Sequence, residues 1–154
     1  MSESNTAKEV EERVALLTRL RDNLLKQREK FEEYLLVLEE EETAISNRDS
    51  ERLSHLVELE SRIIADIGSV QKVVAPLSEL YRDVTSDPDP EILDLEASLG
   101  RLHREATERN LRNQELLRGG LETLRQEIAS VARPQRAVNV YSSRGTATLL
   151  DIST

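Results

Sequence analysis

The sequence predicts an all-α protein: an elongated, antiparallel, three-helix coiled-coil-like bundle followed by a mostly irregular C-terminal tail. Three observations support this prediction. Apolar residues recur every seven positions along the first 46 residues, and a seven-residue step returns to nearly the same face of an α-helix. Two short segments rich in Asn, Asp, Ser or Pro, residues 45–51 and 85–90, interrupt the apolar pattern. Charged residues make up 33% of the chain and aromatic residues 3%, as is typical of long helices that each bury one stripe.

The first helix is predicted over residues 6–46. Thr6 and Glu9 match a capping box, and no Pro or Gly interrupts the segment. Arg28 and Glu42 occupy seam positions, so either their charged groups reach solvent or they form a polar contact that fixes the register. The glutamate run 39–42 is interpreted as a solvated face, not a metal site. The apolar seam consists of Val10, Leu17, Leu24, Phe31, Leu38 and Ile45, with Val14, Leu20 and Leu35 at the alternate position.

Two further helices are predicted over residues 50–84 and 90–132. Asn47 or Asp49 can cap the second helix, and so short a connection returns it antiparallel to the first. The apolar rhythm stays in phase across Pro76, which indicates a kink in the helix, not its end. Asp89 and Pro90 are suited to start the third helix. The predicted bundle therefore covers residues 1–133, with a flexible docking tail at 134–154.

The third helix carries two unusual features on its seam. Asn110 and Asn113 either mark exposed surface or form a buried polar layer that sets the register. Two adjacent glycines, residues 119–120, weaken the helix and indicate either a close approach by another helix or simple local tolerance. Beyond the asparagines, the seam continues as an apolar stripe that we predict to be a binding surface for a partner, which would be the client if the protein is a chaperone. This stripe is formed by Leu117, Leu121, Leu124 and Ile128.

Composition and motifs argue against several classes of function. The formal net charge of −9 disfavours nucleic acid as a partner, because binding to phosphates requires a basic surface. The polar, acidic N-terminal segment is unlike a signal peptide, and no apolar run approaches the roughly 18 residues that span a membrane. We therefore expect a cytoplasmic protein without membrane insertion. The chain contains no cysteine, and its two histidines, His55 and His103, are expected at the surface. No cofactor or metal motif is present, so the sequence predicts a binding protein and not an enzyme.

Two stretches of the sequence resemble the FlgN family of flagellar export chaperones. Residues 35–53 are similar to that family's leucine- and glutamate-rich helix end, short Arg-Asp turn and returning helix. Residues 108–117 resemble its Asn-x-x-Asn segment, and Tyr141 with Gly145 resembles its C-terminal tyrosine followed by a glycine. The resemblance covers most of the chain, although the glycine pair at 119–120 departs from the family's pattern.

The resemblance implies a cytoplasmic chaperone that binds the terminal segments of hook-filament junction proteins and delivers them to the flagellar export apparatus. Tyr141 and Gly145 would then dock on the cytoplasmic domain of the export gate; alternatively, Tyr141 folds back over the end of the bundle. Such a chaperone is expected to be a monomer or a weak dimer with its groove free. A structural coiled-coil adaptor or spacer is the competing function, and it predicts an obligate oligomer.

Overall fold

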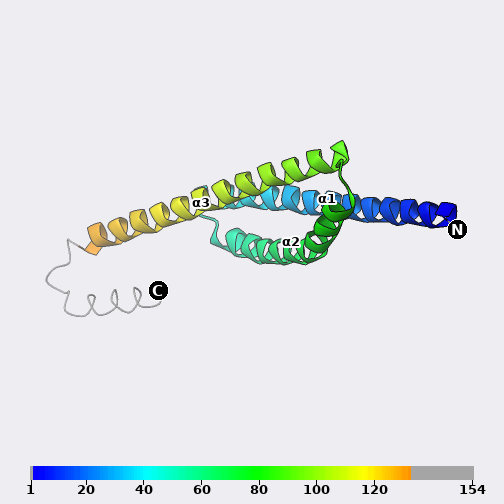
Figure 1. Ribbon diagram of the computed structural model, residues 1–154. Coiled ribbons are helices and arrows are strands. Elements are labelled where there is room, and N and C mark those ends of the chain that lie inside the picture. The colour runs from blue at the N-terminus through cyan, green and yellow to red at the C-terminus, as the bar shows by residue number, and fades with distance from the viewer. Residues whose placement is uncertain (1, 133–154) are drawn as a thin grey trace. The chain divides into compact units, whose positions relative to one another are not determined.

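The computed structural model describes residues 2–132, which form three α-helices joined by two short turns (Figure 1). Helix α1 spans Ser2–Ser46, α2 spans Ser50–Val84 and α3 spans Pro90–Ala132. No strand occurs within residues 2–132, and the all-α prediction is confirmed. The chain divides into two units, which meet between Leu116 and Leu117.

The first turn sends α2 back along α1. Arg48 adopts the left-handed conformation with a φ of 55°, and the backbone N–H of Asp49 donates to the carbonyl of Ala44 at 2.9 Å. The Asp49 side chain then caps α2 by accepting a 3.1 Å hydrogen bond from the backbone N–H of Arg52. Because the connection has only three residues, α1 and α2 are antiparallel neighbours, as the sequence predicts (Figure 1).

The second turn is fixed from both of its sides. The Asp89 side chain accepts a 2.8 Å hydrogen bond from the backbone N–H of Glu91 in the first turn of α3. The backbone N–H of Asp89 in turn donates at 2.8 Å to the hydroxyl of Tyr81 near the end of α2. Tyr81 is buried, so this turn is attached to the core and not only to its own backbone.

The first turns of α1 differ from the prediction. The helix begins at Ser2, and the Thr6 hydroxyl donates to the Ser2 carbonyl at 2.8 Å, so Thr6 is an internal helical residue and not a cap. Val10 and Val14 are 53% and 56% exposed, and all residues from 2 to 15 are exposed. Val10 and Val14, two residues of the predicted apolar seam, are therefore not covered by another helix within residues 2–132.

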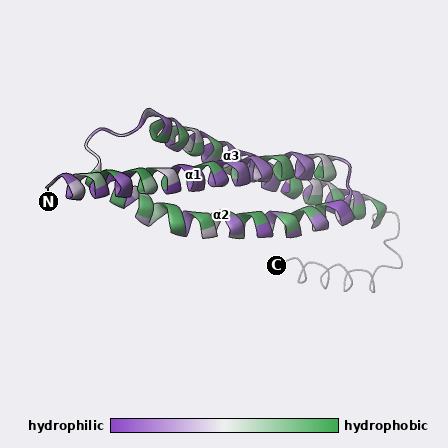
Figure 2. Ribbon diagram, turned by 90° about the vertical axis from the view of Figure 1, so that its right-hand side faces the viewer, coloured by the Kyte–Doolittle hydropathy of each residue, from purple (hydrophilic) through white to green (hydrophobic). Residues whose placement is uncertain are grey.

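Helix α2 continues through Pro76 and ends at Val84, as the in-phase rhythm predicts. A proline inside a helix removes one backbone hydrogen bond and crowds the preceding turn, which favours a bend. Figure 1 shows α2 bending toward its C-terminal end. In Figure 2, hydrophobic and hydrophilic residues alternate along all three helices, as expected for helices that bury one face.

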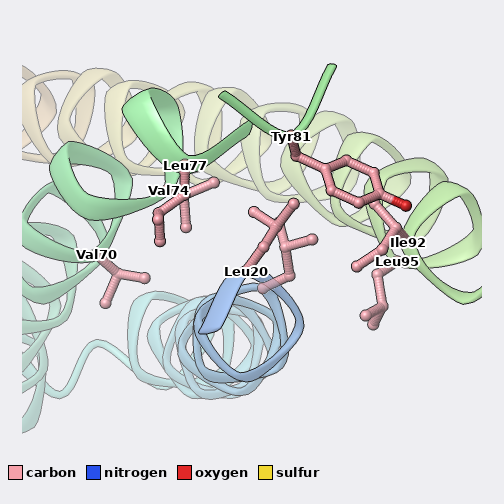
Figure 3. Close-up of a cluster of buried hydrophobic side chains, with 8 residues drawn as sticks. Leu20, Val70, Val74, Leu77, Tyr81, Ile92 and Leu95 are labelled. Carbon is pink, nitrogen blue, oxygen red and sulfur yellow. The ribbon is translucent and has the colours of Figure 1, made fainter. Parts of the chain in front are cut away.

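The core of the first unit consists of two hydrophobic clusters that all three helices share. One cluster surrounds Leu20 of α1, which is fully buried and lies between side chains of α2 and α3 (Figure 3). The other surrounds Phe31 and Leu38 of α1 and reaches Ala106 of α3. The buried members are Leu20, Leu24, Val70, Val74, Leu77, Tyr81, Ile92 and Leu95 in the first cluster, and Phe31, Tyr34, Val37, Leu38, Ala44, Leu56, Ile63 and Ala106 in the second.

Candidate functional site

The second unit presents an uncovered apolar stripe on the C-terminal part of α3. Its members follow one another in steps of four and three residues, the spacing of a coiled-coil seam. The four predicted client-binding residues are all exposed: Leu117 by 43%, Leu121 by 48%, Leu124 by 47% and Ile128 by 49%. Val131 extends the stripe by one further step and is more exposed still. So many large apolar side chains at seam spacing indicate a surface that a partner helix can cover.

The two glycines beside this stripe meet no other part of the described chain. A Cβ atom built on Gly119 or on Gly120 would have no neighbour within 4 Å. Packing among residues 2–132 therefore does not require glycine at either position. A close approach by another helix, which is one of the two readings of the glycine pair, would have to come from outside this part of the chain.

A buried polar cluster lies inside the first unit, where sequence reasoning expected a solvated face. Glu41 is only 4% exposed, and its Oε1 atom has no hydrogen-bond partner. Opposite it on α2 is Glu60, whose carboxylate accepts a 3.2 Å hydrogen bond from the buried Tyr34 hydroxyl. Asn113 of α3 completes the cluster and is 5% exposed. The prediction that residues 39–42 form an entirely solvated face is thus wrong for Glu41.

Burial is the main reason that the Glu41 carboxyl holds its proton. Desolvation raises the pKa of Glu41 to about 8, and the neighbouring Glu60 raises it further through a hydrogen bond and its negative charge. The Asn113 amide opposes part of this shift by donating to Glu41. Desolvation and Glu60 also raise the pKa of the Tyr34 hydroxyl. The raised pKa favours the protonated form of the Glu41 carboxyl at neutral pH.

Asn113 is the asparagine that joins α3 to α1. Its side-chain amide donates a 2.9 Å hydrogen bond to the main-chain carbonyl of Leu38. The adjacent Arg112 forms a 3.2 Å ion pair with Glu42, so Glu42 makes a contact between helices as well as reaching solvent. Asn110 is half-buried, whereas Arg28 pairs within its own helix with Glu32 at 4.0 Å. Of the two predicted seam asparagines, the structure thus places Asn113 in a buried polar layer.

An open groove of about 810 Å³ lies in the first unit between α2 and α3, with α1 at its floor. On the floor, Gln27 donates a 2.6 Å hydrogen bond to Gln71. Glycines occur on both walls, Gly68 on α2 and Gly100 on α3, and a Cβ atom at Gly68 would meet nothing within 4 Å. The sequence does not predict this groove, because its two glycines lie on different helices and no local sequence motif links them.

Tyr141 and Gly145 lie outside the described residues. His55 and His103 are both exposed, and the His103 ring contacts the edge of Phe31 with 6.0 Å between ring centroids. Residues 2–132 contain no group of three or more acidic or histidine side chains placed to hold a metal ion. In the same part of the chain, no helix is long and apolar enough to cross a membrane.

Long helices, an exposed apolar seam and a buried polar layer define a helical binding protein. The chain belongs to the FlgN family, because the family model described as FlgN protein matches residues 16–148. It is also 34% identical over 145 residues to an uncharacterized protein of Treponema pallidum (strain Nichols), and the match covers 94% of each chain. No solved structure matches the chain. Membership of this family of chaperones supports a role in flagellar export.

Proposed function

We propose that this protein is a cytoplasmic chaperone of flagellar type III export that binds the terminal amphipathic segments of hook-filament junction proteins. The observation that carries the proposal is the exposed stripe on α3, in which leucine and isoleucine recur at seam spacing. An incoming amphipathic helix can bury this stripe as the fourth helix of a bundle buries its apolar face. Binding keeps the client's own apolar face away from other molecules before export.

The binding free energy available from the stripe fits a releasable client. Full burial of one leucine contributes about 1.5–3 kcal/mol, and part of this gain is offset by the cost of ordering a flexible segment. Four or five half-exposed residues therefore support a complex that is specific but can still dissociate. An exposed stripe in the free protein also fits a monomer or weak dimer.

Delivery to the export gate is the second part of the proposal. We assign it to Tyr141 and Gly145, which match the family's tail motif. Tyrosine gives a short peptide segment a large contact area and a hydroxyl group at little entropic cost. Pro134 separates these residues in the sequence from α3, so client binding and gate docking can use different parts of the chain.

The test is a double substitution in the centre of the stripe, Leu121→Asp with Leu124→Asp. The matched control is Thr123→Asp with Gln126→Asp, which makes the same charge change on the other face of the same helix. Affinity for the terminal segment of a junction protein is measured by isothermal titration calorimetry, after circular dichroism has shown that each variant remains helical. We expect the stripe variant to lose more than about tenfold in affinity and the control to lose little.

Two results would contradict the proposal. Unchanged binding by the folded stripe variant would place the client site elsewhere. Sedimentation equilibrium that finds an obligate oligomer, dissociated by the stripe substitutions, would instead assign the protein to the structural coiled-coil class.

A further inference from the structure

Two arginines border the stripe on α3 at equivalent positions. Arg118 follows Leu117 and Arg125 follows Leu124, so the two arginines are seven residues apart and lie on the same side of the seam. The other side carries Gly120 and then Glu127. In a coiled coil, residues that border the seam face the corresponding border residues of the partner helix, where opposite charges attract. The charge pattern of the border therefore carries information about the partner.

Neither arginine is used within the described part of the chain. Arg118 and Arg125 are exposed and form no ion pair there. The arginines of α3 that belong to the first unit behave differently: Arg109 pairs with Glu105 at 3.4 Å and Arg112 pairs with Glu42 at 3.2 Å. The two border arginines thus keep their charges available to a molecule that covers the stripe.

A second copy of the same helix is a poor partner for this border. In an antiparallel pair aligned on the stripe, Arg118 of each helix faces Arg125 of the other, which places like charges together twice. In a parallel pair, Gly120 faces Arg125, and no attraction between opposite charges is gained. The border therefore disfavours self-pairing. The two positive charges would instead favour a helix that carries carboxylates.

We propose that the stripe selects a partner helix from another protein that carries acidic residues, seven positions apart, beside its apolar seam. This inference rests on the proposed client-binding function and specifies the chemistry of the client. Acidic residues at that spacing meet both Arg118 and Arg125 in either helix orientation. On the opposite border, Gly120 leaves space for a large side chain of the partner, because nothing in the described chain lies within 4 Å of its missing Cβ.

The net charge of the second unit is compatible with an acidic partner. Residues 117–154 contain five arginines and only three acidic residues, in a chain whose net charge is −9. Within this unit, residues 117–132 carry two arginines and two glutamates, and the positive excess comes from residues 133–154. Attraction between exposed opposite charges adds little affinity, but it discriminates between partners and accelerates their encounter.

The test uses three synthetic helical peptides that share one apolar seven-residue repeat. Their border positions carry glutamate, lysine or glutamine, and their binding to the full chain is measured by fluorescence anisotropy at low salt. The protein variants are Arg118→Glu with Arg125→Glu, and a control of equal charge change, Arg13→Glu with Arg19→Glu, at exposed positions of α1. We expect the glutamate peptide to bind the wild-type protein most tightly. The border variant should lose about tenfold for that peptide and gain affinity for the lysine peptide, whereas the control should keep the wild-type order.

The outcomes separate this inference from the proposed function. Equal binding of the three peptides, or no measurable binding of any, overturns the acidic-partner inference. If the junction-protein segment still loses binding with Leu121→Asp and Leu124→Asp in that case, the stripe remains the client site and only its charge preference is wrong. Self-association of the chain through the stripe would assign the surface to a second copy and overturn the inference as well.

Discussion

The side-chain amide of Asn113 donates a 2.9 Å hydrogen bond to the main-chain carbonyl of Leu38. That carbonyl belongs to the C-terminal part of α1, so the bond joins a side chain of α3 to the backbone of another helix. Only a side chain with a hydrogen-bond donor can make such a contact, and a shift of α3 by one turn would leave the amide buried without this partner. Asn113 therefore fixes how α3 is aligned along α1 in the first unit.

The first prediction follows from that contact. Asn113→Ala should lower the free energy of unfolding by about 1–2 kcal/mol, because it removes a buried hydrogen bond and leaves a small void. Asn110→Ala is the matched control, since Asn110 is only half-buried, and it should change stability by less than about 0.5 kcal/mol. Urea unfolding followed by circular dichroism measures both. Equal losses in the two variants would show that the bond to Leu38 contributes little.

The second prediction concerns pH. Burial raises the pKa of Glu41 from 4.5 to about 8, so the folded chain holds a proton that the unfolded chain releases. The stabilisation from this proton is fully present below about pH 4.5, and it is lost as the pH rises through about 8. The groups that face Glu41 are Glu60 on α2 and Asn113 on α3, with Tyr34 on its own helix. The wild-type protein should therefore become less stable between about pH 5 and pH 8.

Glu41→Gln tests this titration, because glutamine resembles the protonated carboxyl and cannot ionise. The variant should be more stable than the wild type by about 1–3 kcal/mol near pH 8 and nearly equal to it near pH 5. Glu39→Gln, at an exposed position of the same glutamate run, provides the control and should leave the pH profile unchanged. Parallel profiles for the wild type and Glu41→Gln would mean that Glu41 is ionised in the folded chain.

The third prediction distinguishes the two ends of the α1 seam. Leu20 is fully buried between α2 and α3, so Leu20→Ala should lower the free energy of unfolding by about 2–5 kcal/mol. Val14 occupies the same apolar pattern but is 56% exposed, and Val14→Ala should cost less than about 0.5 kcal/mol. Thermal unfolding of both variants provides the comparison. A large loss for Val14→Ala would reveal a partner for the first turns of α1, such as a second copy of the chain.

The fourth prediction uses the two adjacent glycines as an internal control. Each substitution by alanine should increase helix stability by about 0.5–1 kcal/mol, since no atom of the described chain would meet the new methyl group. Gly120 borders the stripe, whereas Gly119 lies on the outer face of the helix. Only Gly120→Ala should therefore weaken client binding, by roughly threefold to tenfold if the client helix approaches closely. Equal affinities for the two variants would show that no client helix packs closely against Gly120.

The fifth prediction concerns the tail. Tyr141→Ala should leave the melting temperature and client affinity unchanged, while binding to the cytoplasmic domain of the export gate and secretion both fall. Tyr141→Phe, which keeps the aromatic ring, separates the contribution of the hydroxyl. A lower melting temperature with unchanged gate binding would instead mean that Tyr141 covers the end of the bundle, and the docking motif would be withdrawn.

Sequence reasoning predicted the helices and turns better than it predicted the α1 seam. The positions at Leu24, Phe31 and Leu38 are buried as expected. The second row of the seam, however, lies three residues after each of these positions and not four. Leu20 was the one visible sign of this row, because the other members are polar or aromatic and do not look like core residues. The row consists of Leu20, Gln27, Tyr34 and Glu41, all of them buried.

The polar members of this row could not be found from apolar periodicity, because their burial depends on partners distant in sequence. Gln27 is buried against Gln71, and Tyr34 donates to Glu60. Glu60 interrupts the apolar rhythm of α2, and Asn113 interrupts that of α3. These interruptions meet near Glu41 only when the three helices are packed together. The sequence contains each exception separately, and the fold brings them into one cluster.

Because α3 runs without a break from Pro90 to Ala132, the stripe is already helical before a partner binds. Beginning a helix is unfavourable, with a nucleation constant near 10⁻³, whereas extending one is close to neutral. The turns of α3 around Ala106 are held by the core of the first unit, so a helical nucleus is already present before residue 117. Residues 117–132 need only to propagate from it. The same residues excised as a free peptide would have to supply about 4 kcal/mol for nucleation before offering a partner the same face.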